Sequence, residues 1–519
     1  MSLVWITFLP LLGALLIGCL PKENKALLRL VALAVTSIVA LLGILLWSSF
    51  DGSQAGMQYL VELDWFRIDG VNGQDVPIQF AMGVDGISIL LVVLTCVLMP
   101  IVVLSTHGHI DTRVKEFFIW LLVMQSGMLG VFLSLDLVLF YFFWEIGLVP
   151  LYFMVGIWGG ERRIYATLKF FLYTVAGSMI MLVGMIALVY HLGSADLVYL
   201  IQAAGDLPEA TQAWIFLSMA LAFAIKVPVL PFHTWLADAH TQAPTSGSVL
   251  LAGVFLKMGT YGLLRFGIQL FPQMALSYST VFLVLGALGI VYGAFLAMAQ
   301  TDIKRLVACS SVSHLGFVVL GLFAMTQAGL RGAVLQMVNH GISTGLLFLL
   351  VGMLYERRHS RALADFGGIA KVMPLFAIFL VFSVLSSAGL PGLNGFVGEY
   401  LILAGTFEVS PLWACVSVSG VIFGAVYLLM ATRRVLFGAL DKDENKALTD
   451  INKREIGLML PLVVLAIWIG VQPNHFLDKT AGTLDALNER IELQRSLQGL
   501  VVGHGGRPSL FVEEENNGH

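Results

Sequence analysis

Fourteen runs of apolar residues, most of them about twenty residues long, dominate this sequence. A helix needs about 20 apolar residues to cross the roughly 30 Å hydrocarbon layer of a bilayer, so each run predicts one membrane-spanning helix. The runs cover residues 2–20, 26–48, 84–105, 114–133, 136–157, 164–192, 211–239, 245–270, 277–299, 305–324, 331–354, 373–407, 412–432 and 456–472. The sequence therefore predicts an all-α integral membrane protein with about fourteen transmembrane helices.

The composition indicates that lipid surrounds most of the chain. Apolar residues make up 58% and charged residues 12% of the 519 residues, and the mean hydropathy is +0.88. The formal net charge of −4 is too balanced for a nucleic-acid binder. The first run has no basic segment before it, which favours a membrane span over a cleaved signal peptide.

Motifs for cofactor or metal chemistry are absent from the sequence. The four cysteines lie far apart in apolar stretches, with no CxxC pair and no cluster of Cys and His. This pattern argues against iron–sulfur clusters, structural zinc and a disulfide framework. GxGxxG, Walker A and HExxH motifs are also missing. We therefore expect no cofactor and no metal in this chain.

Basic residues test the helix count independently, because Lys and Arg accumulate in short cytoplasmic loops. One set of alternate connections holds nineteen of them: Lys22, Lys25, Arg29, Arg113, Lys115, Arg162, Arg163, Lys304, Arg305, Arg357, Arg358, Arg361, Lys371, Arg433, Arg434, Lys442, Lys446, Lys453 and Arg454. The opposite set holds only Arg67 and Arg331. We therefore expect an even number of spans, with both termini on the exported side, away from the cytoplasm.

Three segments lie outside these spans. Residues 50–82 are polar with alternating apolar positions, which predicts a short exported hairpin. Residues 480–498 carry apolar residues at near-helical spacing, which predicts a helix along the membrane surface or a neighbouring subunit. The last twenty residues are rich in Gly and Glu and are expected to be disordered.

The chain divides into four predicted parts. Residues 1–83 hold the first two spans and the hairpin, and residues 84–270 hold spans three to eight. Residues 271–435 hold spans nine to thirteen, and residues 436–519 hold the last span, the amphipathic segment and the tail.

Proline interrupts the seventh and twelfth runs, each time beside an ionisable residue. Pro228 and Pro231 follow Lys226, and Pro391 with several glycines precedes Glu399. Non-helical backbone at membrane depth survives only beside protein or water. Two broken helices five spans apart indicate inverted five-helix repeats, spans four to eight and nine to thirteen, as in many transporters.

Six ionisable residues lie inside the predicted spans, where a charge costs at least about 2.5–3.5 kcal/mol. These candidate site residues are Glu145, Lys226, Lys257, His314, His340 and Glu399. If Glu145 and Lys226 were about 4 Å apart, their attraction at an effective dielectric near 20 would be about 4 kcal/mol. Opening such a pair would release a proton from Lys226 toward Lys257. For the histidines, hydrogen-bonded packing is an equal alternative, and a static ion pair is the alternative for Glu145 and the lysines.

Two further histidines invite a metal interpretation. His233 and His240 are seven residues apart and share a helical face, but no third ligand accompanies them at a fitting spacing. We favour a polar, hydrated end of the broken helix.

The remaining charged residues have structural interpretations. Asp85 and Asp136 are expected to cap helices or lie at interfaces. Arg265 and Lys169, near span ends, are expected to extend toward the bilayer surface. A cytoplasmic turn of structural importance is predicted for Gln300, Asp302, Lys304 and Arg305.

Five long motifs, in order along the chain, carry a resemblance to a known family: GVDGIS, FYFFWEIGLVPLYFMVGIWGG, KVPVLPFHTWLADAH, GVFLKMGTYGLLRF and QTDIKRLVACSSVSHLG. The chain resembles the proton-pumping antiporter-like subunits of respiratory complex I (NADH-quinone oxidoreductase). The resemblance extends from Asp85 to about Arg434, and several long motifs in the right order make it specific.

The resemblance implies a role for each candidate residue. Glu145 and Lys226 would form a pair facing the channel of a neighbouring subunit. Lys257 would be the central relay, and Glu399 the terminal group connecting to the exit side. Sibling subunits and related cation/proton antiporters tend to carry lysine at the position of Glu399, so the glutamate selects one branch of the family. Polar positions of the family's central axis are matched by His314 and His340.

The resemblance also implies partners and a location. The chain would carry no redox site, and NADH, FMN, iron–sulfur clusters and quinone would belong to partner subunits. Expected partners are two sibling antiporter-like subunits, small membrane subunits, a lateral helix from a neighbour, lipid and protons, without nucleic acid. The expected location is a bacterial inner membrane.

Two alternatives are open at this point. The first is a subunit of a multi-subunit Na⁺/H⁺ antiporter, against which Glu399 argues because lysine is expected there. The second is a structural role, in which the buried charges only hold helices together.

Overall fold

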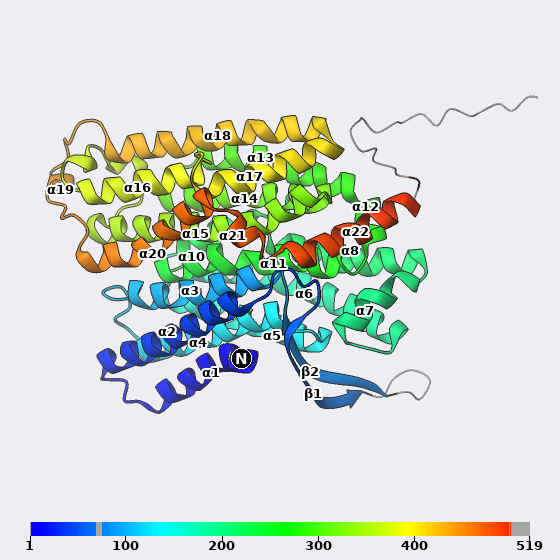
Figure 1. The fold of residues 1–519 in the computed structure, drawn as a ribbon. Helices are drawn as coiled ribbons and strands as arrows, with labels where there is room; N and C mark the ends of the chain where they lie inside the picture. Colours follow the sequence, from blue (N-terminus) through cyan, green and yellow to red (C-terminus); the bar gives the residue numbers. More distant parts are fainter. Residues whose placement is uncertain (1, 69–74, 498, 500–519) are drawn as a thin grey trace, which may run out of the picture.

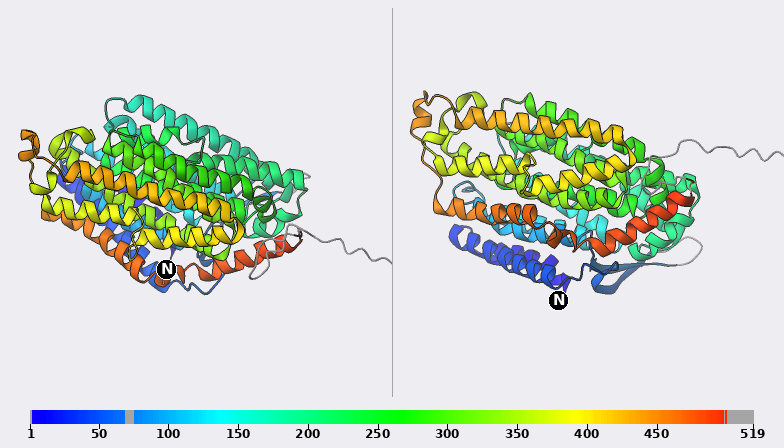
Figure 2. Two further views of the ribbon diagram at one scale, coloured as in Figure 1. Left: turned by 90° about the horizontal axis from the view of Figure 1, so that it is seen from above. Right: turned by 45° about the horizontal axis from the view of Figure 1, so that its top comes forward.

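The computed structural model describes residues 2–68, 75–497 and 499. The predicted disordered tail therefore lies outside the described residues. Long helices run side by side along one direction in every view (Figures 1 and 2). The helices are α1 Leu3–Cys19, α2 Lys25–Ser49, α3 Ile89–Ser105, α4 Val114–Leu133, α5 Leu137–Trp158, α6 Arg163–Leu192, α7 Leu197–Ala203, α8 Glu209–Lys226, α9 Thr234–Gln242, α10 Thr245–Leu250, α11 Leu256–Gly262, α12 Pro272–Ser277, α13 Ser279–Met298, α14 Ile303–Ala324, α15 Gln327–Arg358, α16 Pro374–Ser387, α17 Asn394–Val409, α18 Pro411–Leu436, α19 Asp443–Lys446, α20 Lys453–Val471, α21 Asn474–Leu477 and α22 Ala481–Leu497.

Every predicted apolar run coincides with one helix or with successive helices. In the described part of the chain, ten helices are long and apolar enough to cross a bilayer, and α1, α3 and α16 are shorter apolar helices. The predicted class, a mostly helical membrane protein, is confirmed. A large apolar core of buried Leu, Val, Ile and Phe side chains connects α1 to α22, and a smaller one lies between α13, α14 and α17.

Both predicted helix breaks are present. The seventh run divides into α8 and α9, and the twelfth into α16 and α17. In the second break, Gly389 and Gly392 have φ values of 77° and 90°. Only glycine adopts such angles without steric strain, so these two positions explain why the glycine-rich sequence breaks there.

The two ends of the bundle differ in their connections. The short helix α19 lies at one end, whereas α7, α12 and the β-hairpin lie at the opposite end (Figure 1). The connection that contains α19 belongs to the predicted basic set, and the connections with α7, α12 and the hairpin belong to the other set. We call these the basic end and the hairpin end.

The predicted hairpin is confirmed. Strands β1 (Gln58–Ile68) and β2 (Val76–Val84) pair antiparallel, with Val61 opposite Met82. Its described part is tied to the bundle by Asp136, whose Oδ2 accepts a hydrogen bond of 3.1 Å from the amide of Gln79. The other oxygen of Asp136 accepts from the amides of Val138 and Leu139, which confirms the predicted helix cap.

Replacement of Asp136 by Ala is expected to destabilise the protein by about 1 kcal/mol, the usual cost of losing such a cap. The amide of Gln79 should also exchange hydrogen faster, because it loses its acceptor. Asp196→Ala is the control, since Asp196 caps the short helix α7 by one bond to Val198. Thermal unfolding and hydrogen exchange measure both effects, and unchanged exchange at Gln79 would contradict the proposed tether.

The C-terminal amphipathic segment is helical, as predicted, but most of its apolar face does not look outward. Leu484, Leu487 and Ile491 are buried within this chain, whereas Leu497 is 71% exposed. Helix α22 packs against α12 and α15. Arg495 donates to the carbonyls at the end of α14, so the segment ties helix ends together.

Candidate functional site

The break between α8 and α9 places Lys226 inside the bundle. Lys226 is the last residue of α8 and is 1% exposed. Its Nζ lies 4.4 Å from the ring centroid of Trp144 and 3.6 Å from that of Phe255. Aromatic faces attract a cation electrostatically, so the two rings stabilise the ammonium group where hydrogen-bond partners are missing among the described residues.

The structure does not bring Glu145 into direct contact with Lys226. Within the described chain, no nitrogen–oxygen contact of 4.0 Å or less joins the two. Glu145 instead lines an apolar groove of about 440 Å³ on the outside of α5, beside the exposed side chains of Phe142 and Val149. The separation of about 4 Å that was considered from the sequence is therefore not reached in this structure, where aromatic rings surround the ammonium group.

Two π-helical segments flank the short helix that carries Lys257. Residues Leu251–Phe255 and Leu263–Ile268 are π-helical on either side of α11. Such segments occur frequently at functional sites. Lys257 is 0% exposed, and its Nζ donates to the carbonyl of Ala252, five residues earlier.

Lys257 begins a chain of buried polar side chains that crosses to the second broken helix. Its Nζ lies 2.6 Å from Nδ1 of His340 on α15. The rings of His340 and His314 are 5.9 Å apart between centroids. Nδ1 of His314 on α14 lies 3.2 Å from Oε1 of Glu399 on α17. All four side chains are buried, so the structure brings together Lys257, both histidines and Glu399.

A small cavity lies beside the two histidines. It has a volume of about 10 Å³ and is lined by His314, His340 and polar residues of α15 and α16. This volume is close to the minimum that holds one water molecule. Nε2 of each histidine is buried without a hydrogen-bond partner among the described residues.

Glycine makes room for the carboxylate of Glu399. A Cβ atom at Gly389 would lie 3.0 Å from Oε2 of Glu399, and one at Gly398 would lie 2.3 Å from Oε1 of Gln336. Nε2 of Gln336 donates to Glu399 over 3.3 Å. A side chain at Gly389 would therefore crowd the carboxylate directly, and one at Gly398 would displace the glutamine that donates to it.

Sequence reasoning missed the polar row on α15. Gln336, Asn339 and Ser343 lie beside His340, and Asn339 donates to the carbonyl of Asn394 across the second break. Asn394 in turn accepts from Ser386 over 2.6 Å. The spacing of three, four and seven residues on one helix, within an apolar run, was the signal available in the sequence.

The metal interpretation of His233 and His240 finds no support. The described residues contain no group of three or more potential metal ligands. His240 is 0% exposed and stacks on Phe348 with ring centroids 4.7 Å apart, so its ring is packed inside the bundle. His233 packs beside Tyr292.

Arg265 corrects one further prediction. It is 1% exposed and pairs with Asp85 over 2.5 Å, so it does not extend toward the bilayer surface. Lys304, in the predicted structural turn, is buried and donates to the carbonyl of Ala243 over 2.5 Å. Lys169 pairs with Asp238 over 2.7 Å. Each of these cations contacts a hydrogen-bond acceptor or a carboxylate from a distant part of the sequence, which the local sequence does not reveal.

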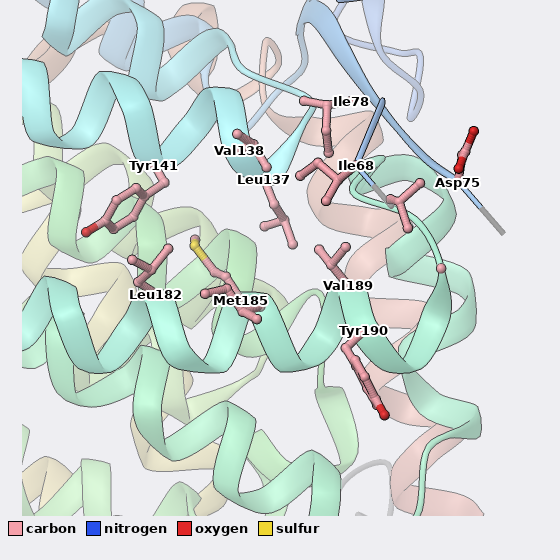
Figure 3. A pocket seen from close by; sticks show the side chains of 13 residues that line it. Ile68, Asp75, Ile78, Leu137, Val138, Tyr141, Leu182, Met185, Val189 and Tyr190 are labelled. Atoms are coloured by element: carbon pink, nitrogen blue, oxygen red, sulfur yellow. The ribbon is translucent and has the colours of Figure 1, made fainter. Parts of the chain in front are cut away.

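Two other cavities differ in character. A mostly apolar cavity of about 380 Å³ lies between β2, the start of α5 and the end of α6 (Figure 3). None of the residues from Lys257 to Glu399 described above lines it. A cavity of about 430 Å³ at the basic end is lined by polar and charged groups, including Gln242 and Lys304. It reaches Thr245, where the helix run carrying Lys257 begins.

Comparisons with known proteins agree with this fold. Residues 134–424 match the family described as NADH:quinone oxidoreductase/Mrp antiporter, TM, and residues 25–132 match NADH-ubiquinone oxidoreductase chain 4, amino terminus. NADH-quinone oxidoreductase subunit M of Rhodobacter capsulatus is 44% identical over 91% of this chain and 93% of its own.

Two solved structures share the fold. A chain in the structure of respiratory complex I from Thermus thermophilus with bound NADH has a TM-score of 0.83 and 31% identity, covering 95% of this chain and 100% of that one. A chain of the Mrp complex from Dietzia sp. DQ12-45-1b has a TM-score of 0.81 at 20% identity, covering 95% and 99%, which supports the fold alone.

The helical bundle with two broken helices and a buried chain of ionisable groups defines an antiporter-like membrane protein. The chain belongs to the NADH:quinone oxidoreductase/Mrp antiporter transmembrane family. The resemblance found in the sequence is confirmed. The branch indicated by Glu399 is the chain M (NuoM) type, in agreement with the relatives named subunit M.

Proposed function

We propose that this chain is a proton-translocating membrane subunit of an NADH-quinone oxidoreductase, driven by quinone reduction in partner subunits. The relatives named subunit M and the fold shared with a chain of complex I support this function. The observation that carries it is the row of buried titratable groups from Lys257 to Glu399, with two direct contacts and one step of 5.9 Å between the ring centroids of His340 and His314. Its members span both predicted repeats, as a lateral relay requires.

Proton transfer along this row follows from the chemistry of each group. Lys257 gives its proton to Nδ1 of His340, and an imidazole can accept at one nitrogen while releasing at the other. A water in the small cavity would bridge the unpartnered Nε2 atoms of His340 and His314. His314 then protonates Glu399. Moving one charge against 100 mV takes about 2.3 kcal/mol, which a change in one buried contact can supply.

Proton transfer from Lys226 to Lys257 has no direct path in this structure. Lys226 and Lys257 share no hydrogen bond within the described residues, and the ring of Phe255 covers the ammonium group of Lys226. The proposed relay therefore has a gap there, which opens only if that ring moves or water enters.

Partners and orientation are part of the same proposal. The chain holds no redox site, and NADH, FMN, iron–sulfur clusters and quinone belong to other subunits. The apolar groove beside Glu145 supports a neighbouring membrane subunit at that face, because the exposed side chains of Phe142 and Val149 line it. Sibling antiporter-like subunits, small membrane subunits and a lateral helix are the expected partners.

We also propose fourteen crossings of a bacterial inner membrane, arranged as two inverted five-helix repeats. The basic end faces the cytoplasm, because Lys and Arg gather there, and both termini face the exported side. The coincidence of all fourteen runs with helices supports this count.

A subunit of a multi-subunit Na⁺/H⁺ antiporter is the second candidate. The Mrp structure shares the fold, but relatives of high identity carry oxidoreductase names. The identity of the chains that purify with this one separates the two, since only the first candidate has quinone-reductase partners.

Glu399→Gln tests the proposed relay in the assembled complex. Glutamine keeps the size and hydrogen bonding of Glu399 but cannot carry the proton, so this chain's share of pumped protons should disappear. Glu408→Gln is the control, since Glu408 is exposed near the end of the same helix. Protons pumped per NADH in proteoliposomes are measured beside assembly. Wild-type stoichiometry in an assembled Glu399→Gln complex would refute the assignment.

A further inference from the structure

The hairpin end of the bundle holds a second buried polar cluster, which the proposed relay does not use. Arg265 forms two hydrogen bonds with the carboxylate of Asp85, at 2.7 Å and 2.5 Å. Its Nε donates to the hydroxyl of Tyr261 over 3.2 Å, and its Nη1 also donates to Gln269 over 2.8 Å. We call these four residues the Arg265 cluster.

The Arg265 cluster lies between Lys257 and the hairpin end. Arg265 is eight residues beyond Lys257 on the same helical run, which is about 12 Å at 1.5 Å per residue. Tyr261 lies between them, and its hydroxyl donates to the carbonyl of Phe132 over 3.4 Å. Asp85 directly follows the hairpin. A proton that left Lys257 toward the hairpin end would therefore meet this cluster.

The Arg265 cluster differs from the relay in how many of its buried polar atoms have hydrogen-bond partners. In the relay, Nζ of Lys226 and Nε2 of both His314 and His340 are buried without partners among the described residues. In the cluster, each nitrogen of Arg265 has an acceptor, and both oxygens of Asp85 have donors. Oδ1 of Asp85 also accepts from the amides of two following residues.

This arrangement opposes proton conduction for a chemical reason. A guanidinium group carries only donors and does not lose its proton in proteins, so Arg265 cannot relay one. It also fixes the hydroxyl of Tyr261, whose lone pair faces Arg265 and whose hydrogen faces the Phe132 carbonyl. A fixed arginine in a narrow path adds an electrostatic barrier to protons.

We propose that the Arg265 cluster seals the hairpin end of the bundle against protons from Lys257. A proton on Lys257 can then leave only by transfer to His340, parallel to the membrane plane. This inference rests on the proposed function. It explains why a titratable lysine at the centre of one repeat does not discharge directly across the membrane, and it assigns Asp85, Tyr261 and Arg265 as positioning residues.

The test is passive proton conductance of the assembled complex in proteoliposomes without substrate. The variant Asp85→Asn with Arg265→Gln removes both charges together and keeps similar sizes. Its conductance is expected to rise on the order of tenfold, which corresponds to a barrier lowered by about 1.4 kcal/mol. Adding Lys257→Met should return the conductance to the wild-type value, because the leak passes through Lys257.

Each outcome decides the proposal. An assembled double variant that conducts like wild type overturns the seal, and so does a leak that persists with Lys257→Met. If the double variant does not assemble, Tyr261→Phe keeps the ion pair and removes the fixed hydroxyl. It should still raise the conductance about twofold, a barrier change of roughly 0.4 kcal/mol, and a wild-type value overturns the seal. Normal pumping by Lys257→Met alone would instead refute the proposed function.

Discussion

Replacement of Lys257 by Met is expected to abolish the proton transport of this chain, while electron transfer in partner subunits persists at a reduced rate. Methionine has nearly the same length as lysine and suits a position that is 0% exposed. It can neither hold nor release a proton, so His340 loses its donor. The loss of one buried hydrogen-bond partner costs about 1–3 kcal/mol, which a large membrane subunit tolerates.

Lys257→Arg separates proton release from charge. Arginine keeps the positive charge but does not deprotonate in proteins. If Lys257 acts as a relay, both variants lose pumping, whereas a residue that only holds helices together by its charge would tolerate arginine. Lys442→Met is the control, because Lys442 lies in a surface loop beside Asp365. Protons pumped per NADH are measured together with assembly, and wild-type pumping by Lys257→Arg would refute the relay.

The sequence predicted the helices well because bilayer thickness leaves few choices. Three patterns in the sequence reflect the thickness and the two sides of the bilayer. They are the fixed length of the apolar runs, the prolines inside two of these runs, and the basic residues in alternate loops. The breaks beside Lys226 and Glu399 followed from Pro and Gly, whose backbone effects are local. Such features depend on neighbouring residues in the chain, so no knowledge of the tertiary fold is needed.

The contacts of the site were predicted only in part. The sequence shows that Lys257, His314, His340 and Glu399 lie at membrane depth, but not which helix faces another. The polar row on α15 had a helical spacing that could have marked the shared face. For Glu145 and Lys226, the sequence does not fix the distance between side chains on different helices, so it could not tell that aromatic rings, and not the carboxylate, contact the ammonium group.

The pair of Asp85 and Arg265 was beyond sequence reasoning for a related reason. The two residues are 180 positions apart, and each alone resembles an ordinary helix-end residue. Their contact joins the segment between β2 and α3 to the π-helical end of the run that carries Lys257. Only packing of distant elements creates it.

Asp85→Ala is expected to destabilise the subunit by about 3–5 kcal/mol, because it leaves a buried guanidinium without its counter-charge. Total stabilities of folded domains are about 5–15 kcal/mol, so such a loss is a large fraction and should lower the yield of the assembled complex. Adding Arg265→Met should restore most of the stability lost in Asp85→Ala, since apolar replacements of a buried ion pair are often neutral or stabilising. The double replacement removes the charge that has lost its partner.

The yield and thermal midpoint of the assembled complex measure this rescue. Asp111→Ala is the control, because Asp111 pairs with Arg29 at the surface, where an ion pair contributes about 0–1 kcal/mol. If the single variant is as stable as the double one, Arg265 must find another partner when Asp85 is removed. The fixed contacts of the Arg265 cluster would then not depend on the ion pair, and the seal above Lys257 would lose its structural basis.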